Sequence, residues 1–189
     1  MQTFLHWFCF VAVGMVTAAI GELQFSVFLR GDWANWIGSL AVNAVFCTGL
    51  WLLYRLLFLP LAGRRWQLAA YVAVTGVAGL AMEWFAIGNS PWGNPDASQV
   101  AMFAYWASMA LAPVVVLEGS ARLRRQFLAV ALVYLGVAVA VQMVENVDIH
   151  WVWHIWSVVI GYVLLLGWLV RVLWREPSLI RSVAPNSLV

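Results

Sequence analysis

The chain has 189 residues, of which 65% are hydrophobic and only 10% are charged, with a formal net charge of +2. Soluble domains carry about 25% charged residues, so this composition excludes a water-soluble globular protein and indicates an integral membrane protein. All ten basic residues are arginine, which excludes chemistry that needs a lysine, and no basic stripe is present to bind nucleic acid.

Six apolar segments follow one another along the chain. A helix needs about 20 residues to cross a bilayer, and each segment meets or approaches this length. None shows the two-residue alternation of apolar and polar residues that is typical of barrel strands. The segments are 4–29, 36–59, 66–87, 99–117, 127–144 and 151–174. We therefore predict an all-α, polytopic integral membrane protein with six transmembrane helices. A single domain is expected over residues 1–176, followed by a flexible cytoplasmic tail over 177–189.

The arginines predict the orientation of these helices. Nine of the ten fall in the 2–3 turn, in the 4–5 turn or at the C-terminal end, and only Arg30 lies on the other side. The positive-inside rule places the arginine-rich side, with both termini, in the cytoplasm. We expect a location in the bacterial inner membrane, with no signal peptide at the N-terminus.

Three glutamates are predicted to meet near the opposite, outer side. Glu22 and Glu83 lie within apolar segments, and Glu145 ends the fifth segment. Ionisable side chains inside a membrane are rare and usually functional. Like charges at one depth in a low dielectric cannot all ionise, so one carboxyl holds a proton or shares a cation. We therefore predict that these three glutamates are catalytic; the alternative is that each joins helices by structural hydrogen bonds.

Two histidines in the sixth segment suggest a metal site. His150 and His154 are four residues apart, which places both imidazoles on one face of a helix. With Glu83 or Glu145 they would bind a divalent metal such as zinc, although this spacing is a weak motif and interfacial roles are the alternative. His6 is expected at the opposite membrane face as an interfacial residue, so we do not expect a haem held by two histidines of this chain.

The outer side is also rich in tryptophan and carries the longest loop, "GNSPWGNPDAS". We predict that Trp84, Trp92, Asn89 and Trp153 contact a substrate, with Trp92 closing the site from the loop. The alternative for the tryptophans is an ordinary interfacial belt.

These patterns favour a membrane-embedded enzyme, of hydrolase, isomerase or cyclase type, that acts on a lipid or isoprenoid-like substrate through its outward-facing Glu/His cluster. One alternative is a cation- or proton-coupled transporter or channel of small solutes. The inner half argues against transport, because beyond Asn43, Thr48 and Thr75 no hydrophilic path continues towards the cytoplasm. The other alternative is an accessory subunit of a larger complex or oligomer.

Overall fold

The computed structural model describes residues 2–28, 31–58, 64–93, 99–143, 166–168, 170–172 and 174–175. The regular elements within these ranges are all helical, which confirms the predicted all-α class for this part of the chain. The α-helices are α1 (Gln2–Glu22), α2 (Trp33–Leu53), α3 (Arg64–Met82), α4 (Gln99–Glu118) and α5 (Ala121–Met143). The helical residues at 166–168, 170–172 and 174–175 form a sixth helical region. The predicted tail, 177–189, lies outside the described residues.

Among the described residues, three helical segments are long and apolar enough to cross a membrane: Gln2–Glu22, Trp33–Leu56 and Ala69–Ile87. A shorter apolar helix covers Met102–Glu118. Large apolar side chains such as Phe8, Val45 and Leu56 are exposed on these helices. Apolar faces of this kind are stable against lipid and unstable against water, so the structure supports a bilayer environment.

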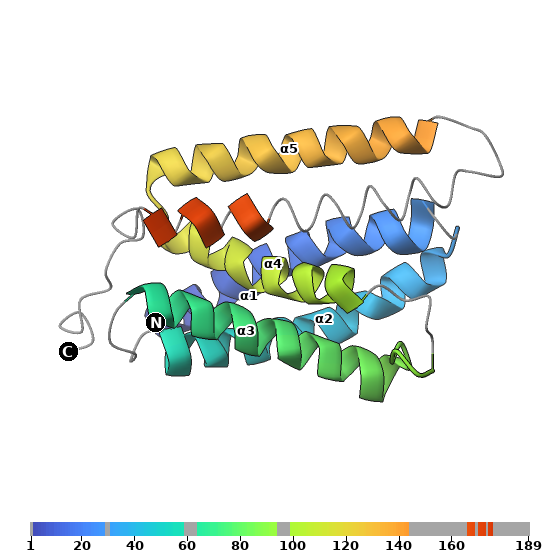
Figure 1. The fold of residues 1–189 in the computed structure, drawn as a ribbon, viewed down its shortest axis with the longest axis horizontal. Helices are drawn as coiled ribbons and strands as arrows, with labels where there is room; N and C mark the ends of the chain where they lie inside the picture. Colours follow the sequence, from blue (N-terminus) through green and yellow to red (C-terminus); the bar gives the residue numbers. More distant parts are fainter. Residues whose placement is uncertain are drawn as a thin grey trace.

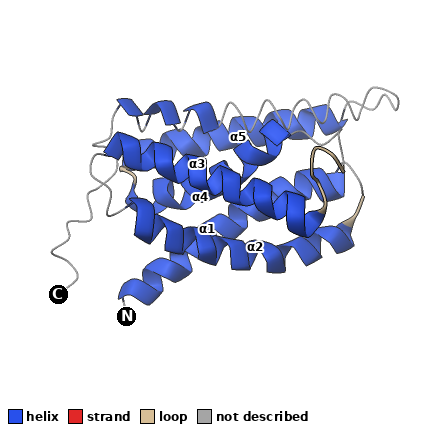
Figure 2. Ribbon diagram, turned by 60° about the horizontal axis from the view of Figure 1, so that its bottom comes forward, coloured by secondary structure: helices blue, strands red, loops and turns tan. Residues whose placement is uncertain are grey.

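The helices lie side by side along the long axis of the molecule, with α4 at the centre (Figures 1 and 2). Helix α1 packs against α2 and α4, and α3 packs against α4. Every residue of α4 from 104 to 115 is buried, as expected for a helix that is apolar on all sides. Glycines permit the closest approach: a Cβ atom added to Gly79 would lie 2.0 Å from Cγ of Trp106. Small residues are what allow helices to approach this closely within a membrane.

Helix α5 begins earlier than its apolar segment. The sequence predicts a loop over 118–126, whereas only Gly119 and Ser120 separate α4 from α5. The Ser120 hydroxyl oxygen accepts the Leu123 N–H at 3.3 Å and so caps the new helix. Hydropathy marks only the part of a helix that lies in lipid, and arginine is a good helix former. The predicted start at residue 127 was therefore wrong by six residues.

Short π-helical segments extend three of the helices. They are η1 (Leu23–Phe28) after α1, η2 (Tyr54–Phe58) after α2 and η3 (Glu83–Ile87) after α3. π-Turns are rare and are frequently found at functional sites. Each of these segments begins at, or directly after, a buried or half-buried polar side chain: Glu22, Tyr54 or Glu83. The sequence pattern did not predict them.

Candidate functional site

Glu83 is the first residue of η3, and it is only 7% exposed. Both of its carboxyl oxygens accept a hydrogen bond from an N–H group. The Trp106 Nε1–H donates to Oε1 at 3.1 Å, and the Asn89 Nδ2–H donates to Oε2 at 2.8 Å. An indole nitrogen can only donate, so this environment suits an ionised carboxylate as the acceptor.

A sharp turn after η3 brings Asn89 back to Glu83. Gly88 has a φ of 91°, in the left-handed region that favours glycine. Its N–H, together with the Asn89 N–H at 2.9 Å, reaches the backbone carbonyl of Glu83. The Asn89 side chain therefore lies beside the carboxyl group that it bonds. On the other side, Trp106 is held in place because Gly79 leaves room for its ring.

Glu22 is the last residue of α1, and its described partners carry hydroxyl groups. The Ser26 hydroxyl donates to Oε2 at 3.1 Å, and the Tyr105 hydroxyl lies 3.5 Å from Oε1. The Asn35 amide of α2 donates in turn to the Ser26 oxygen at 2.9 Å. A hydroxyl group both donates and accepts, so these partners can serve Glu22 with or without a proton.

The two glutamates converge on one position of α4. Tyr105, which contacts Glu22, and Trp106, which bonds Glu83, are adjacent residues of that helix. Carboxyl groups from α1 and η3 are thus held at the same end of the bundle. We call Glu22, Glu83, Asn89, Tyr105 and Trp106 the carboxylate cluster. Glu145, the third glutamate predicted to join it, lies outside the described residues.

The other predicted substrate contacts surround η3. The Trp84 Nε1–H donates to Gln99 Oε1 at 2.6 Å, which ties η3 to the start of α4. The Trp84 ring packs against Trp92, with 5.4 Å between ring centroids. Trp92 is nevertheless 76% exposed, so its ring lies on the surface and does not plug the interior. Trp153 falls outside the described residues.

The predicted metal ligands cannot be placed from this structure, because His150 and His154 lie outside the described residues. Within the described ranges, no group of three or more His, Cys, Asp or Glu side chains is arranged to hold a metal ion. The zinc site therefore stays a prediction that concerns residues 145–154 and their neighbours.

A second polar group, which the sequence analysis missed, lies at the other end of the bundle. His6 Nε2 lies 3.2 Å from Glu118 Oε1, and the Trp51 Nε1–H donates to His6 Nδ1 at 3.1 Å. Because the indole can only donate, Nδ1 bears the lone pair and Nε2 carries the hydrogen that is shared with Glu118. The Tyr54 hydroxyl also bonds Glu118, and the Tyr54 ring stacks on His6 at 6.1 Å. We call these four residues the histidine cluster.

This cluster corrects two expectations. His6 is not merely an interfacial residue, since it joins α1 to α2 and α4. The arginine-rich half of the molecule also holds more polar groups than Asn43, Thr48 and Thr75. The available sequence signal was that His6 and Glu118 both fall at the arginine-rich ends of their apolar segments.

No protein-family model matches the sequence, and no curated protein or solved structure is significantly similar to it. The fold and the site therefore indicate a general class of protein and not a particular protein family. In its described residues, the chain is an α-helical protein with candidate membrane spans and a partly buried polar cluster near each end of the bundle.

Proposed function

We propose that the protein is a membrane-embedded enzyme whose carboxylate cluster performs acid–base chemistry on a lipid or isoprenoid-like molecule. The observation that carries the proposal is the convergence of Glu22 and Glu83 on adjacent residues of α4. Ionisable side chains are costly within a membrane, and a functional role is their default explanation. Both glutamates also lie at junctions between α-helical and π-helical turns.

The hydrogen-bond partners support different roles for the two glutamates. Glu83, bonded by N–H groups, fits the role of an ionised base that also stabilises positive charge on the substrate. Glu22, bonded by hydroxyl groups, fits the role of the proton donor. A proton passes from Glu22 to a substrate double bond, and Glu83 removes a proton from a neighbouring carbon. The substrate is isomerised or cyclised without another reactant, and a proton returns to Glu22 before the next turnover.

The surroundings of Glu83 support an apolar substrate. Phe85, Ile87 and Trp92 are exposed large apolar side chains on or just after η3. A buried carboxylate next to exposed apolar surface favours a ligand that arrives from the lipid with its hydrocarbon part against these side chains. The positive-inside rule would place this end at the periplasmic or outer side.

A metal-assisted version of the reaction would use His150 and His154 with Glu145 or Glu83. Zinc in that position would activate a water molecule for hydrolysis. Metal analysis of the purified protein and of a His154→Ala variant tests this version, which requires bound zinc in the first and its loss in the second. Equal zinc content in both would count against it.

Deuterium exchange tests the acid–base proposal without knowledge of the product. The purified protein is placed in nanodiscs of bacterial polar lipids with added farnesol, geranylgeraniol or squalene, in heavy water. Proton transfer to carbon introduces deuterium, which mass spectrometry detects even when substrate and product interconvert. We expect Glu22→Gln and Glu83→Gln to lower the exchange rate by about 100-fold or more, the usual contribution of a general acid or base.

Asp32→Asn is the matched control, because it makes the same carboxyl-to-amide change at the same end of the bundle. Asp32 caps α2 through a 2.8 Å bond from the Asn35 N–H, and asparagine caps a helix equally well. This variant is expected to exchange at the wild-type rate. Exchange at the wild-type rate in both glutamine variants would overturn the proposal. It would also be overturned if the wild-type protein catalysed no exchange in any of the three isoprenoids or in the bacterial lipids.

A further inference from the structure

The carboxylate cluster and the histidine cluster lie at opposite ends of the same two helices. Glu22 and His6 are 16 positions apart on α1, and Tyr105 and Glu118 are 13 positions apart on α4. At 1.5 Å per residue these intervals are roughly 24 Å and 20 Å. Since the hydrocarbon core of a bilayer is about 30 Å thick, the two clusters are separated by most of its thickness.

Buried hydroxyl and thiol groups lie in the interval between the clusters. The Tyr54 hydroxyl bonds Glu118, and the Tyr54 ring meets that of Tyr71 with 6.0 Å between centroids. The Tyr71 hydroxyl points towards α4, where it donates to the Ala110 carbonyl at 3.1 Å. These two tyrosines extend the polar groups of the histidine cluster into the middle of the bundle.

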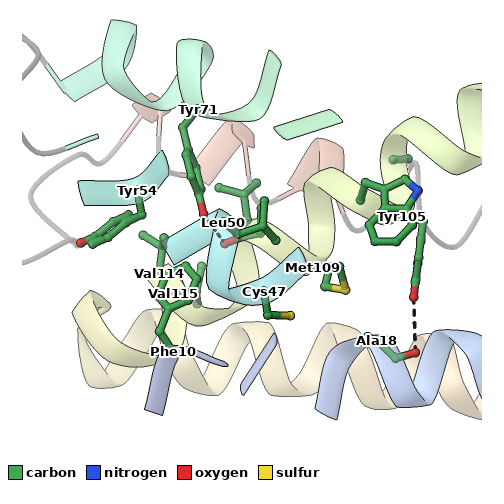
Figure 3. Close-up of a cluster of buried hydrophobic side chains, with 14 of the residues drawn as sticks. Phe10, Ala18, Cys47, Leu50, Tyr54, Tyr71, Tyr105, Met109, Val114 and Val115 are labelled. Atoms are coloured by element: carbon green, nitrogen blue, oxygen red, sulfur yellow. Dashed lines mark hydrogen bonds between the residues drawn. The ribbon is translucent and has the colours of Figure 1, made fainter. Parts of the chain in front are cut away.

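Cys47 marks the midpoint of the interval. A Cβ atom on Gly14 would lie 2.7 Å from the Cys47 sulfur, and Gly14 is eight residues from both His6 and Glu22 on α1. Cys47 is fully buried, and it belongs to the same cluster of buried side chains as Tyr71 and Tyr105. Figure 3 shows Tyr54 and Tyr71 towards one side of Cys47 and Tyr105 towards the other.

Two polar atoms on the helices that carry Cys47 and Tyr105 lack hydrogen-bond partners within the described residues. Asn43 Nδ2 and Ser108 Oγ are buried without a partner in the described part of the chain. Asn43 is one helical turn from Cys47, and Ser108 is three residues from Tyr105. An unbonded polar group in the interior costs about 1–3 kcal/mol, and buried groups of this kind are normally bonded to water. Water at this point would connect the two halves of the interval.

We propose that these groups carry protons through the bundle between Glu118 and Glu22, by way of Tyr54, Tyr71, Cys47 and Tyr105. Water bonded by Asn43 and Ser108 completes the path in its middle. At each step a hydroxyl, thiol or water accepts one proton and releases another, so that one proton moves across the membrane and no group changes its oxidation state. This activity goes beyond the proposed acid–base chemistry and does not depend on it.

Proton flux into liposomes tests the proposal. Vesicles that contain the purified full-length protein and a trapped pH-sensitive dye are given a potassium diffusion potential with valinomycin. Wild-type protein is expected to acidify the interior faster than protein-free vesicles do. Tyr105→Phe and Ser108→Ala, which remove hydroxyl groups from the path and keep the packing, should return the rate to the protein-free background.

Thr48→Val is the matched control, because it removes a hydroxyl that lies on α2 and bonds the Ala44 carbonyl at 3.0 Å instead of a group on the path. This variant is expected to keep the wild-type flux. If Tyr105→Phe fails to fold, Tyr54→Phe makes the same change in the other half of the path. Wild-type flux equal to that of empty vesicles, or hydroxyl-deletion variants on the path that conduct like Thr48→Val, would overturn the inference.

Discussion

Replacing Gly79 by alanine is expected to disrupt the carboxylate cluster from a distance. The added methyl group would lie 2.0 Å from Cγ and 2.3 Å from Cβ of Trp106. Trp106 is only 1% exposed, so its ring has little space into which it can move. A shift large enough to relieve the contact strains the packing around the ring and moves its N–H away from Glu83.

The magnitude follows from two costs. Overpacking a tight interior costs about 1–3 kcal/mol. Loss of a hydrogen bond to a charged group adds about 1.5–3 kcal/mol. The sum, about 2.5–6 kcal/mol, is large compared with the roughly 0.5–1 kcal/mol that alanine usually gains over glycine within a helix.

The assay is unfolding of the detergent-solubilised protein by titration with SDS, followed by circular dichroism. Gly49→Ala is the control, because a Cβ atom there meets nothing within 4 Å. That variant should keep or slightly raise the wild-type stability. In a Trp106→Leu background, Gly79→Ala should add little further loss, because the smaller side chain leaves room for the methyl group. Equal stability of the Gly79→Ala and Gly49→Ala proteins would refute the reasoning.

The remaining predictions concern the turn, the histidine cluster, a helix cap and the orientation. Gly88→Ala should lower the free energy of unfolding by about 1–2 kcal/mol, since an alanine is strained at positive φ, and Gly88→Asn should cost less; equal losses would contradict the left-handed turn. A double-mutant cycle of His6→Phe and Trp51→Phe should give a coupling energy of about 1 kcal/mol, and additive effects would exclude the bond between them. Ser120→Ala should cost about 1 kcal/mol and Ser120→Asn much less, whereas an unchanged stability of both would show that α5 does not need this cap. Fusion of alkaline phosphatase to either terminus should give an inactive enzyme in a bacterial host, and activity at either end would contradict the prediction that both termini are cytoplasmic.

The carboxylate cluster could be predicted from the sequence only in part. Glu22 and Glu83 stand out because a carboxylate within an apolar segment is conspicuous, and their positions near the ends of segments that run in the same direction indicated a common depth. Their hydrogen-bond partners did not stand out. Tyr105 and Trp106 look like ordinary apolar residues of α4, and only packing shows that one faces α1 and the other faces η3.

The histidine cluster was missed for a related reason. Membrane ends are rich in aromatic and polar residues, so a histidine or a carboxylate there is normally interpreted as interfacial. The bond between His6 and Glu118 joins residues 112 positions apart in the sequence. No local pattern predicts a contact between helices at such a separation.

The sequence by itself determined that the protein is helical, which segments prefer lipid, and that carboxylates occur where they are costly. Hydropathy and the cost of burying charge depend on residue type and local order alone, so a linear reading is sufficient for them. The tertiary structure decided which side chains meet, where α-helices change to π-helices, and that polar groups occur at both ends of the bundle. Those features depend on how helices that are distant in the sequence pack against α4. Gly79 of α3, for example, leaves the space in which the Trp106 ring of α4 reaches Glu83.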